Sequence, residues 1–188
     1  MSAAGNGSAP APQAAVAGAA AAVPAAASGW RWLPLAAAII VADQLLKAWI
    51  VQHFAPLERL QVLRVLDIIL TYNTGAAFSF LSDASGWQRW LFVLLALGVS
   101  AVLIVWMRRL RAAVHGLLAC GLALIVGGAL GNMIDRLTLG RVVDFIHVHW
   151  RQAYFPAFNL ADSAITVGAV VLLIDAWRET RAARRVRG

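Results

Sequence analysis

The sequence has few charged residues and a single cysteine, and both shortages narrow the class of protein. Only 13% of its 188 residues are charged, about half the share of an ordinary soluble domain, while 61% are hydrophobic. A chain of this length cannot bury so much apolar surface in one water-soluble core, because its surface-to-volume ratio is too high. An intrinsically disordered chain is excluded as well, since it requires low hydrophobicity. Cys120 has no partner for an internal disulfide and lies in an apolar run, where packing is the simplest interpretation. The natural solvent of this chain is therefore a lipid bilayer.

The first 28 residues contain no charged residue and little bulky side-chain mass. They are rich in Ala, with Gly, Ser and Pro. A secretory signal needs a basic region ahead of its apolar stretch, which this segment does not have. The composition predicts a disordered tail over residues 1–28, followed by a membrane domain over 29–179 and a basic cytoplasmic tail over 180–188.

Four apolar runs follow, each long enough to cross a bilayer core of about 30 Å at a rise of about 1.5 Å per residue. They are Leu33–Val51, Trp90–Met107, Val114–Ile134 and Leu160–Trp177. Tryptophan residues lie near the edges of these runs, where interfacial side chains are enriched. The expected fold class is an all-α membrane protein, with a bundle of four transmembrane helices.

The formal net charge of +7 comes from basic residues that flank the apolar runs. Arg108, Arg109 and Arg111 fill the short link between the second and third runs, and further Arg residues follow the fourth. Cytoplasmic segments carry the excess of Lys and Arg, so both termini and this link are expected in the cytoplasm. Residues 52–89 and 135–159 then lie on the outer side, although they also contain six Arg residues. The basic residues fit contacts with membrane lipids better than contacts with nucleic acid.

The two outer segments are not simple polar loops. Leu60–Phe80 is rich in β-branched and aromatic residues and has a break at Gly75, and Arg141–Trp150 has the sequence RVVDFIHVHW. Such sequences favour short strands, or an amphipathic segment lying against the membrane surface. We expect a small extracytoplasmic platform on the four-helix bundle.

Ionisable side chains inside or beside a span are costly, and are therefore candidates for function. Asp43 and Lys47 are spaced i,i+4 on one helix face, where they either form a structural ion pair or anchor a polar group of a neighbouring loop or substrate. At the end of the third span, Asn132, Asp135 and Arg136 form one polar face. The alternative there is a helix cap with a surface ion pair of little energetic value.

Gly127 and Gly131 in the third span form a G-x-x-x-G step, which allows another helix to approach closely. We interpret this step as a packing feature. A non-catalytic membrane scaffold assembled through these glycines is one alternative function for the chain. A small transporter or channel, with the charged side chains along a polar path, is another.

Asp144 lies in the apolar, strand-like run Val142–Val148, and Asp162 lies in the expected first turn of the fourth span, three residues after Asn159. Asn159 is a suitable cap for that helix, whose N-terminus favours an ionised carboxylate. The expected topology brings both carboxylates to the outer interface. Two close carboxylates share a proton, so one can activate a water molecule while the other donates to a carbonyl oxygen. This chemistry is that of an aspartic peptidase; two aspartates that merely cap helix ends are the alternative.

His147 and His149 would face the same side of a strand, whereas Asp144, an odd number of residues away, would face the other. The sequence contains no H-E-x-x-H motif. We therefore expect two interfacial histidines rather than a metal site.

Several short motifs occur in the order and spacing of one known family. They are Asp43–Lys47 (DQLLK), Tyr72–Phe78 (YNTGAAF), Gly127–Asn132 (GGALGN) leading to Asp135 and Arg136, then Gly140, Val142, Asp144 and Phe145, and finally Phe155–Ser163 (FPAFNLADS). In these motifs the chain resembles lipoprotein signal peptidase, also called signal peptidase II, a family of bacterial membrane aspartic peptidases. The resemblance covers about residues 31–178, and the N-terminal 28 residues match no motif of the family.

The resemblance implies a peptidase domain of four transmembrane helices with cytoplasmic termini, a periplasmic β-cradle and a surface helix. It assigns the catalytic pair to Asp144 and Asp162. Supporting or substrate-binding positions fall on Asn132, Asp135, Arg136, Asn159, Asp43, Lys47, Asn73 and Gly75.

The implied substrate is a diacylglyceryl-modified prolipoprotein, cut just before its lipidated Cys in the bacterial cytoplasmic (inner) membrane. The active site is implied at the outer membrane face. Membrane lipids and globomycin-type inhibitors are the other partners that the family suggests. No metal, organic cofactor or nucleic acid is implied, and we expect a monomer.

Overall fold

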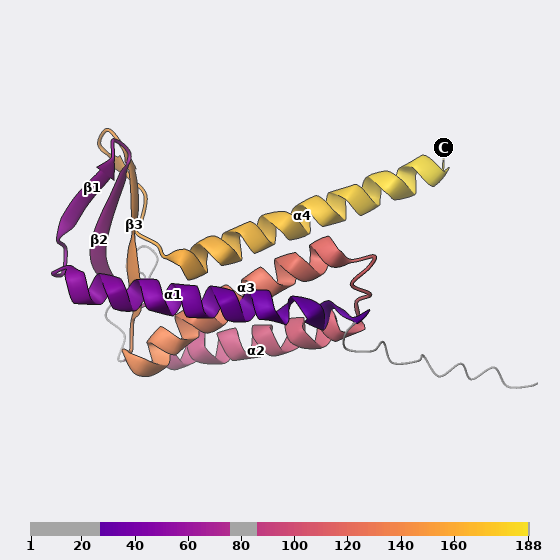
Figure 1. Ribbon diagram of the computed structural model, residues 1–188, viewed down its shortest axis with the longest axis horizontal. Helices are drawn as coiled ribbons and strands as arrows, with labels where there is room; N and C mark the ends of the chain where they lie inside the picture. The colour runs from indigo at the N-terminus through magenta and orange to yellow at the C-terminus, as the bar shows by residue number, and fades with distance from the viewer. Residues whose placement is uncertain (1–26, 76–85, 188) are drawn as a thin grey trace, which may run out of the picture.

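The computed structural model describes residues 27–75 and 86–187, which form four long helices and one small antiparallel sheet (Figure 1). The helices are α1 (Leu33–His53), α2 (Trp87–Arg109), α3 (Gly116–Thr138) and α4 (Leu160–Arg187), and a 3-10 turn, η2 (Gly29–Trp32), precedes α1. The strands are β1 (Arg59–Leu63), β2 (Leu66–Asn73), β3 (Val142–Trp150) and β4 (Ala153–Tyr154). Most of the tail predicted over residues 1–28 lies outside the described residues.

The folded chain begins slightly before the predicted start of the membrane domain. Ala112 N donates a hydrogen bond to Ala27 O (2.9 Å), and the Ser28 hydroxyl accepts one from Trp30 N (3.2 Å). Ala27 and Ser28 therefore belong to the folded domain rather than to the tail, because the link between α2 and α3 holds them in place.

All four long helices are apolar and long enough to cross a membrane. α4 begins at Leu160 as predicted, whereas α2 begins at Trp87 rather than Trp90, and α3 begins at Gly116 rather than Val114. α4 also continues beyond Trp177, because the Ala, Arg and Glu residues that follow are good helix formers. The basic segment predicted as a tail over 180–188 is thus helical as far as its penultimate residue.

α3 is the central helix of the bundle and packs against the other three (Figure 1). A Cβ atom at Gly127 would lie 2.9 Å from Ala36 O of α1, and one at Gly128 would collide with Ala161 O of α4. The backbones at these points are too close for any larger residue. The interpretation of the glycine step as a packing feature is therefore confirmed, and Gly128 extends it to a second neighbour.

The sheet has the strand order β1-β2-β3-β4, with each neighbouring pair antiparallel. It lies across one end of the bundle, where α1 ends and α4 begins (Figure 1). Its attachment is apolar: Leu70 of β2 and Val143 and Phe145 of β3 form a buried cluster with Ile50 of α1. The strands predicted between the spans are confirmed. No fifth α-helix occurs within the described residues, so the surface helix implied by the resemblance is not found there, and residues 76–85 fall outside them.

Candidate active site

Asp144 lies on β3 where the strand packs against the helices, and only 2% of the residue is exposed. Asn159 Nδ2 donates a hydrogen bond to Asp144 Oδ1 (2.7 Å), and Asn73 Nδ2 donates one to Asp144 Oδ2 (3.1 Å). Each carboxylate oxygen is thus held by one amide, which fixes the orientation of the group.

Asp162 lies in the first turn of α4, as predicted. Its backbone N–H donates to Asn159 Oδ1 (2.9 Å), and Asn159 N donates in return to Asp162 Oδ2 (3.2 Å). This reciprocal pair is a capping box, and it confirms the predicted Asn159 cap. The second carboxylate oxygen, Oδ1, accepts a hydrogen bond from Asn132 Nδ2 of α3 at 2.7 Å.

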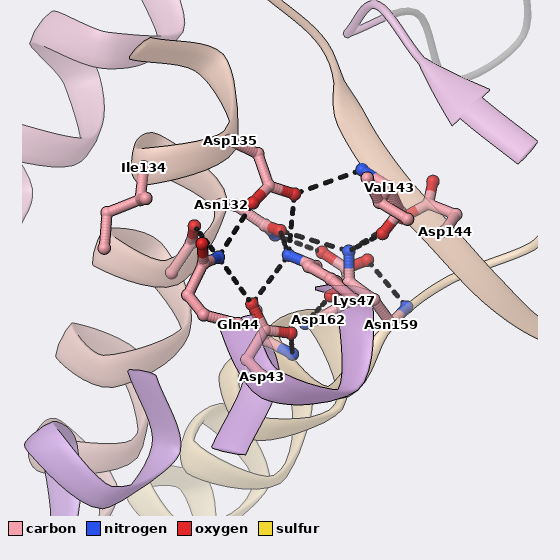
Figure 2. A network of polar contacts seen from close by, with 12 residues as sticks. Asp43, Gln44, Lys47, Asn132, Ile134, Asp135, Val143, Asp144, Asn159 and Asp162 are labelled. Atoms are coloured by element: carbon pink, nitrogen blue, oxygen red, sulfur yellow. Dashed lines mark hydrogen bonds and ion pairs between the residues drawn. The ribbon is translucent and has the colours of Figure 1, made fainter. Parts of the chain in front are cut away.

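Two asparagines join these carboxylates into one network (Figure 2). Asn159 binds both of them, through its side-chain amide to Asp144 and its backbone N–H to Asp162. The same amide lies 3.1 Å from Asn132 Oδ1, and Asn132 donates to Asp162. A strand and a helix therefore bring the two carboxylates to the same place, at the sheet end of the bundle.

The surroundings of Asp144 change its ionisation strongly. Burial, reinforced by the negative charge of Asp162, raises the pKa of Asp144 from 3.8 to about 7. The hydrogen bonds from Asn73 and Asn159 and the positive charge of Lys47 act in the opposite direction but do not cancel this rise. The Asp144 carboxyl therefore exchanges its proton close to neutral pH, which a surface aspartate does not.

Lys47 is a buried cation next to the pair. Its Nζ lies 2.6 Å from Asp43 Oδ2 and 2.9 Å from Asp135 Oδ2, and it donates a hydrogen bond to Asn132 Oδ1 at 2.9 Å. An ammonium group has three protons, and these three acceptors use all of them. The predicted ion pair between Asp43 and Lys47 is confirmed, and Asp135 belongs to it as well (Figure 2).

The carboxylates of this ion cluster also hold neighbouring backbone. Asp43 Oδ1 accepts a hydrogen bond from Ala161 N in the first turn of α4 (2.9 Å), and Asp135 Oδ2 accepts one from Val143 N of β3 (3.1 Å). Removing one partner from a buried ion pair costs about 3–5 kcal/mol, because the other charge is left uncompensated. The cluster thus fixes α4 and β3 at the points where the two aspartates of the pair are attached.

Gln44 is a member of the cluster that sequence reasoning missed. Its Nε2 donates to Asp135 Oδ1 (2.7 Å) and to Gly131 O (3.2 Å). The available signal was an amide residue directly after Asp43 within an apolar run. An uncharged side chain is a weaker indication of a site than an ionisable one, so its position alone does not predict the contacts of Gln44.

Arg136 lies close to the pair but is held by other groups. Its Nη1 donates to Asn132 O (3.2 Å), and its guanidinium lies over the Phe92 ring, 4.8 Å from the ring centroid. Within the described part of the chain, Arg136 forms no ion pair with Asp144 or Asp162. Its charge therefore acts on the site from a distance rather than by direct pairing.

The turn after β2 orients Asn73. Gly75 N donates to Asn73 Oδ1 (2.8 Å), so the amide nitrogen of Asn73 is left to face Asp144. Gly75 has a φ of +111°, in a region that glycine adopts without the strain of a side chain. The last three residues of the YNTGAAF motif, 76–78, lie outside the described residues.

His147 and His149 lie on one face of β3, as predicted, with ring centroids 6.5 Å apart. Tyr154 stacks on His147 at 5.3 Å, and His149 Nε2 lies 3.4 Å from Asp67 Oδ2. Burial, helped by the positive charge of Arg59, lowers the pKa of His147. Across residues 27–75 and 86–187, no three His, Cys, Asp or Glu side chains form a group that could hold a metal ion.

A pocket of about 460 Å³ opens beside Asp162. Its walls come from the loop before α4 and from the first turns of that helix, and its lining residues are Phe155, Phe158, Asp162, Ser163, Thr166 and Val167. Among the described residues that line this pocket, Asp162 is the one with an ionisable side chain. The arrangement places a largely apolar pocket directly against one of the two carboxylates.

Comparison with known proteins gives consistent matches. A family model described as Signal peptidase (SPase) II matches residues 35–178. The chain is 53% identical over 159 residues to the lipoprotein signal peptidase of Pseudomonas aeruginosa (strain UCBPP-PA14), which covers 84% of this chain and 94% of that protein. It is 49% identical over 150 residues to the lipoprotein signal peptidase of Shewanella halifaxensis (strain HAW-EB4), covering 80% and 88%. A solved bacterial membrane enzyme shares the fold with a TM-score of 0.71 at 28% identity, over 80% of this chain and 90% of that chain.

Proposed function

Because the chain belongs to the signal peptidase II family, we propose that it is a membrane endopeptidase that removes the signal peptides of lipid-modified prolipoproteins. The relatives at 53% and 49% identity are lipoprotein signal peptidases. The observation that carries the proposal is the hydrogen-bonded network that joins Asp144 and Asp162 through two asparagines. Such a pair of adjoining carboxylates is the chemical requirement of an aspartic peptidase.

The pocket beside Asp162 supports an apolar substrate. Phe155 and Phe158 form part of its wall, and Val167 of α4 is exposed, on a helix that faces lipid in a membrane. A signal segment that arrives within the bilayer therefore reaches the carboxylates without leaving apolar surroundings. The proposed scissile bond lies just before the diacylglyceryl-modified Cys of the precursor.

The proposed reaction is hydrolysis by one water molecule held between the two carboxyl groups. The ionised carboxylate of Asp162 takes a proton from the water as its oxygen attacks the scissile carbonyl carbon. The protonated Asp144 donates its proton to the carbonyl oxygen, so the tetrahedral intermediate is neutral. Asp162 then returns its proton to the amide nitrogen as the C–N bond breaks, and Asp144 recovers one from the intermediate. The pair thus ends with one proton, as it began.

The neighbouring polar groups prepare the pair for this reaction. Asn132 and Asn159 hold the carboxylates at fixed orientations, which avoids reorganisation during proton transfer. Lys47, Asp43 and Asp135 form an ion cluster behind Asn132 and contribute by positioning. Arg136, held by Asn132 and Phe92, adds positive charge to the surroundings of the pair. No step needs a metal ion or an organic cofactor.

The proposed location is the bacterial inner membrane, with both termini in the cytoplasm and the active site at the outer face. The support is the charge pattern: Arg108, Arg109 and Arg111 and the basic end of α4 lie at the end of the bundle away from the sheet. Membrane lipids, the lipidated precursor and globomycin-type inhibitors are the proposed partners, and the proposed state is a monomer.

The test of this function is cleavage of a defined precursor by the full chain in lipid nanodiscs. One precursor carries the diacylglyceryl group on its Cys, and a matched precursor of identical sequence is unmodified. We expect cleavage of the lipidated precursor directly before its modified Cys, as read by mass spectrometry, and no cleavage of the unmodified one. Equal cleavage of both, cleavage at another bond, or no cleavage in conditions where a related lipoprotein signal peptidase is active contradicts the proposal.

A further inference from the structure

Phe92, in the second turn of α2, contacts two parts of the site without belonging to its hydrogen-bond network. A Cβ atom at Gly75 would lie 2.5 Å from Cε2 and 2.9 Å from Cδ2 of its ring, so one edge of the ring lies directly against the Gly75 backbone. The face of the same ring carries the Arg136 guanidinium at 4.8 Å. The ring is therefore held between α3 and the turn that follows β2.

The contact with Gly75 reaches Asp144 in two further steps. Gly75 N donates to Asn73 Oδ1 (2.8 Å), and Asn73 Nδ2 donates to Asp144 Oδ2 (3.1 Å). Because the amide oxygen of Asn73 is used by Gly75, the side chain presents only its N–H group to the carboxylate. A displacement of Gly75 N would remove the hydrogen bond that orients this amide, and would thereby weaken the hydrogen bond from Asn73 to Asp144.

We propose that Phe92 is a positioning residue for Asp144, whose ring braces the turn at Gly75 and keeps the Asn73 amide directed at the carboxylate. Gly75 has no side chain with which to pack, so the ring of Phe92 supplies the contact that holds this turn. The cation–π contact with the Arg136 guanidinium favours this position of the ring. The inference rests on the proposed function, because it gives Phe92 a role in the proposed acid, Asp144.

Loss of the contact between Phe92 and Gly75 changes the pKa of Asp144 in a predictable direction. The charged groups that act at this point are Asp162 of α4, Lys47 of α1 and Arg136 of α3. The hydrogen bond from Asn73 lowers the pKa of Asp144 from the value that burial alone would set. Loss of the brace therefore raises the pKa of this carboxyl further, while a general loss of folded enzyme reduces activity without moving any pKa.

The experiment measures kcat for the lipidated precursor across a pH series, with the full chain in nanodiscs. In Phe92→Leu we expect kcat to fall about tenfold and the midpoint of the descending alkaline limb to move upward by about half a pH unit or more, the size of one lost hydrogen bond. Phe92→Tyr keeps the ring edge and retains the wild-type midpoint. Leu95→Ala, an exposed position on the same helix, is the matched control and changes neither quantity.

A double-mutant cycle with Asn73→Ala decides whether the effect passes through this amide. Asn73→Ala alone shifts the midpoint upward, and adding Phe92→Leu then gives no further shift. A full additional shift in that background, or a wild-type midpoint in Phe92→Leu, overturns the inference.

The same titration is followed without substrate, from the infrared C=O band of the protonated carboxyl that disappears in Asp144→Asn. If the wild type leaves the lipidated precursor uncut, the proposed function fails, while this band still tests the role of Phe92. An unshifted band midpoint in Phe92→Leu then contradicts the inference on its own.

Discussion

At the scale of single residues, Asp144 combines deep burial with hydrogen bonds that favour its charged form. Burial and the charge of Asp162 prevail over the amides of Asn73 and Asn159, and the pKa of Asp144 rises to about 7. A group that titrates near the working pH is suited to proton transfer, because both of its forms are accessible. The asparagines tune this value, since each of them lowers it.

The rise in the pKa of Asp144 predicts the pH dependence of cleavage. In the proposed reaction the protonated form of Asp144 donates to the carbonyl oxygen, so kcat/KM decreases as the pH rises through about 7. The measurement is kcat/KM for the lipidated precursor at intervals from about pH 5 to about pH 9, because kcat/KM reports the pKa values of the free enzyme. A rate that stays constant from about pH 6 to about pH 8 would show that Asp144 does not act as this acid.

Individual residues differed in how well the sequence indicated their contacts. The pair of Asp43 and Lys47 was predictable, because i,i+4 spacing places both on one helix face. The partners of Asn132 were not, because they depend on how α1, α3 and α4 pack, and no local spacing encodes that packing. The stacking of Arg136 on Phe92 was missed for the same reason.

At the scale of elements, close packing of α3 determines where the carboxylates lie. α3 carries Asn132 and Asp135, and its Gly127 and Gly128 allow α1 and α4 to approach within backbone contact. Asn132 then reaches Asp162 at 2.7 Å, a distance that a wider separation of α3 and α4 would not permit. The glycines of α3 therefore set the distance across which Asn132 and Asp162 form their hydrogen bond.

Replacing Gly128 tests this dependence. In Gly128→Ala the new methyl group collides with Ala161 O, so α4 must shift and carry Asp162 away from Asn132. We expect a lower unfolding temperature in detergent and a large loss of cleavage. Gly98→Ala on α2 is the matched control: nothing lies within 4 Å of its Cβ, and Ala is a better helix former than Gly by about 1 kcal/mol. Equal unfolding temperatures for the two variants would contradict the packing argument.

The elements themselves were largely predictable from hydropathy. The apolar runs gave all four helices, and the β-branched residues of Val142–Val148 gave a strand. The ends of the helices were less predictable. Hydropathy marks only the part of a helix that lies inside lipid. α4 extends past Trp177 because the residues that follow favour a helix in water as well. The short strand β4 carries only two residues and had no sequence signal of its own.

At the scale of the whole molecule, the two ends of the helix bundle carry different sets of charged residues. The ion cluster around Lys47 and the pair of Asp144 and Asp162 all lie at the sheet end of the bundle (Figures 1 and 2). Clusters of Arg lie at the other end. A transporter needs polar groups along the length of its path, and this concentration at one interface fits a surface reaction better.

The architecture as a whole followed from two sequence properties, the length of the apolar runs and the position of basic residues. The meeting of Asp144 and Asp162 required more. The strand and the helix that carry them must be held by side chains from α3, which directly precedes the strand, and from α1, which is distant in sequence. Sequence patterning placed the two carboxylates at one interface. It indicated Asn132 as part of a polar face and Asn159 as a helix cap, but not that their amides join the two carboxylates, because those contacts depend on how the elements pack.

The most direct test of the central claim is the rate at which three matched variants cut the lipidated precursor. Asp144→Asn and Asp162→Asn each keep the shape of the side chain but remove a proton-transfer group, and we predict a loss of about a thousandfold or more in each. Asp67→Asn changes an aspartate of β2 that is as buried as Asp144 but lies outside the network, and this variant is predicted to cleave at close to the wild-type rate. Wild-type cleavage by either Asp144→Asn or Asp162→Asn, with the fold intact by circular dichroism, would contradict the account.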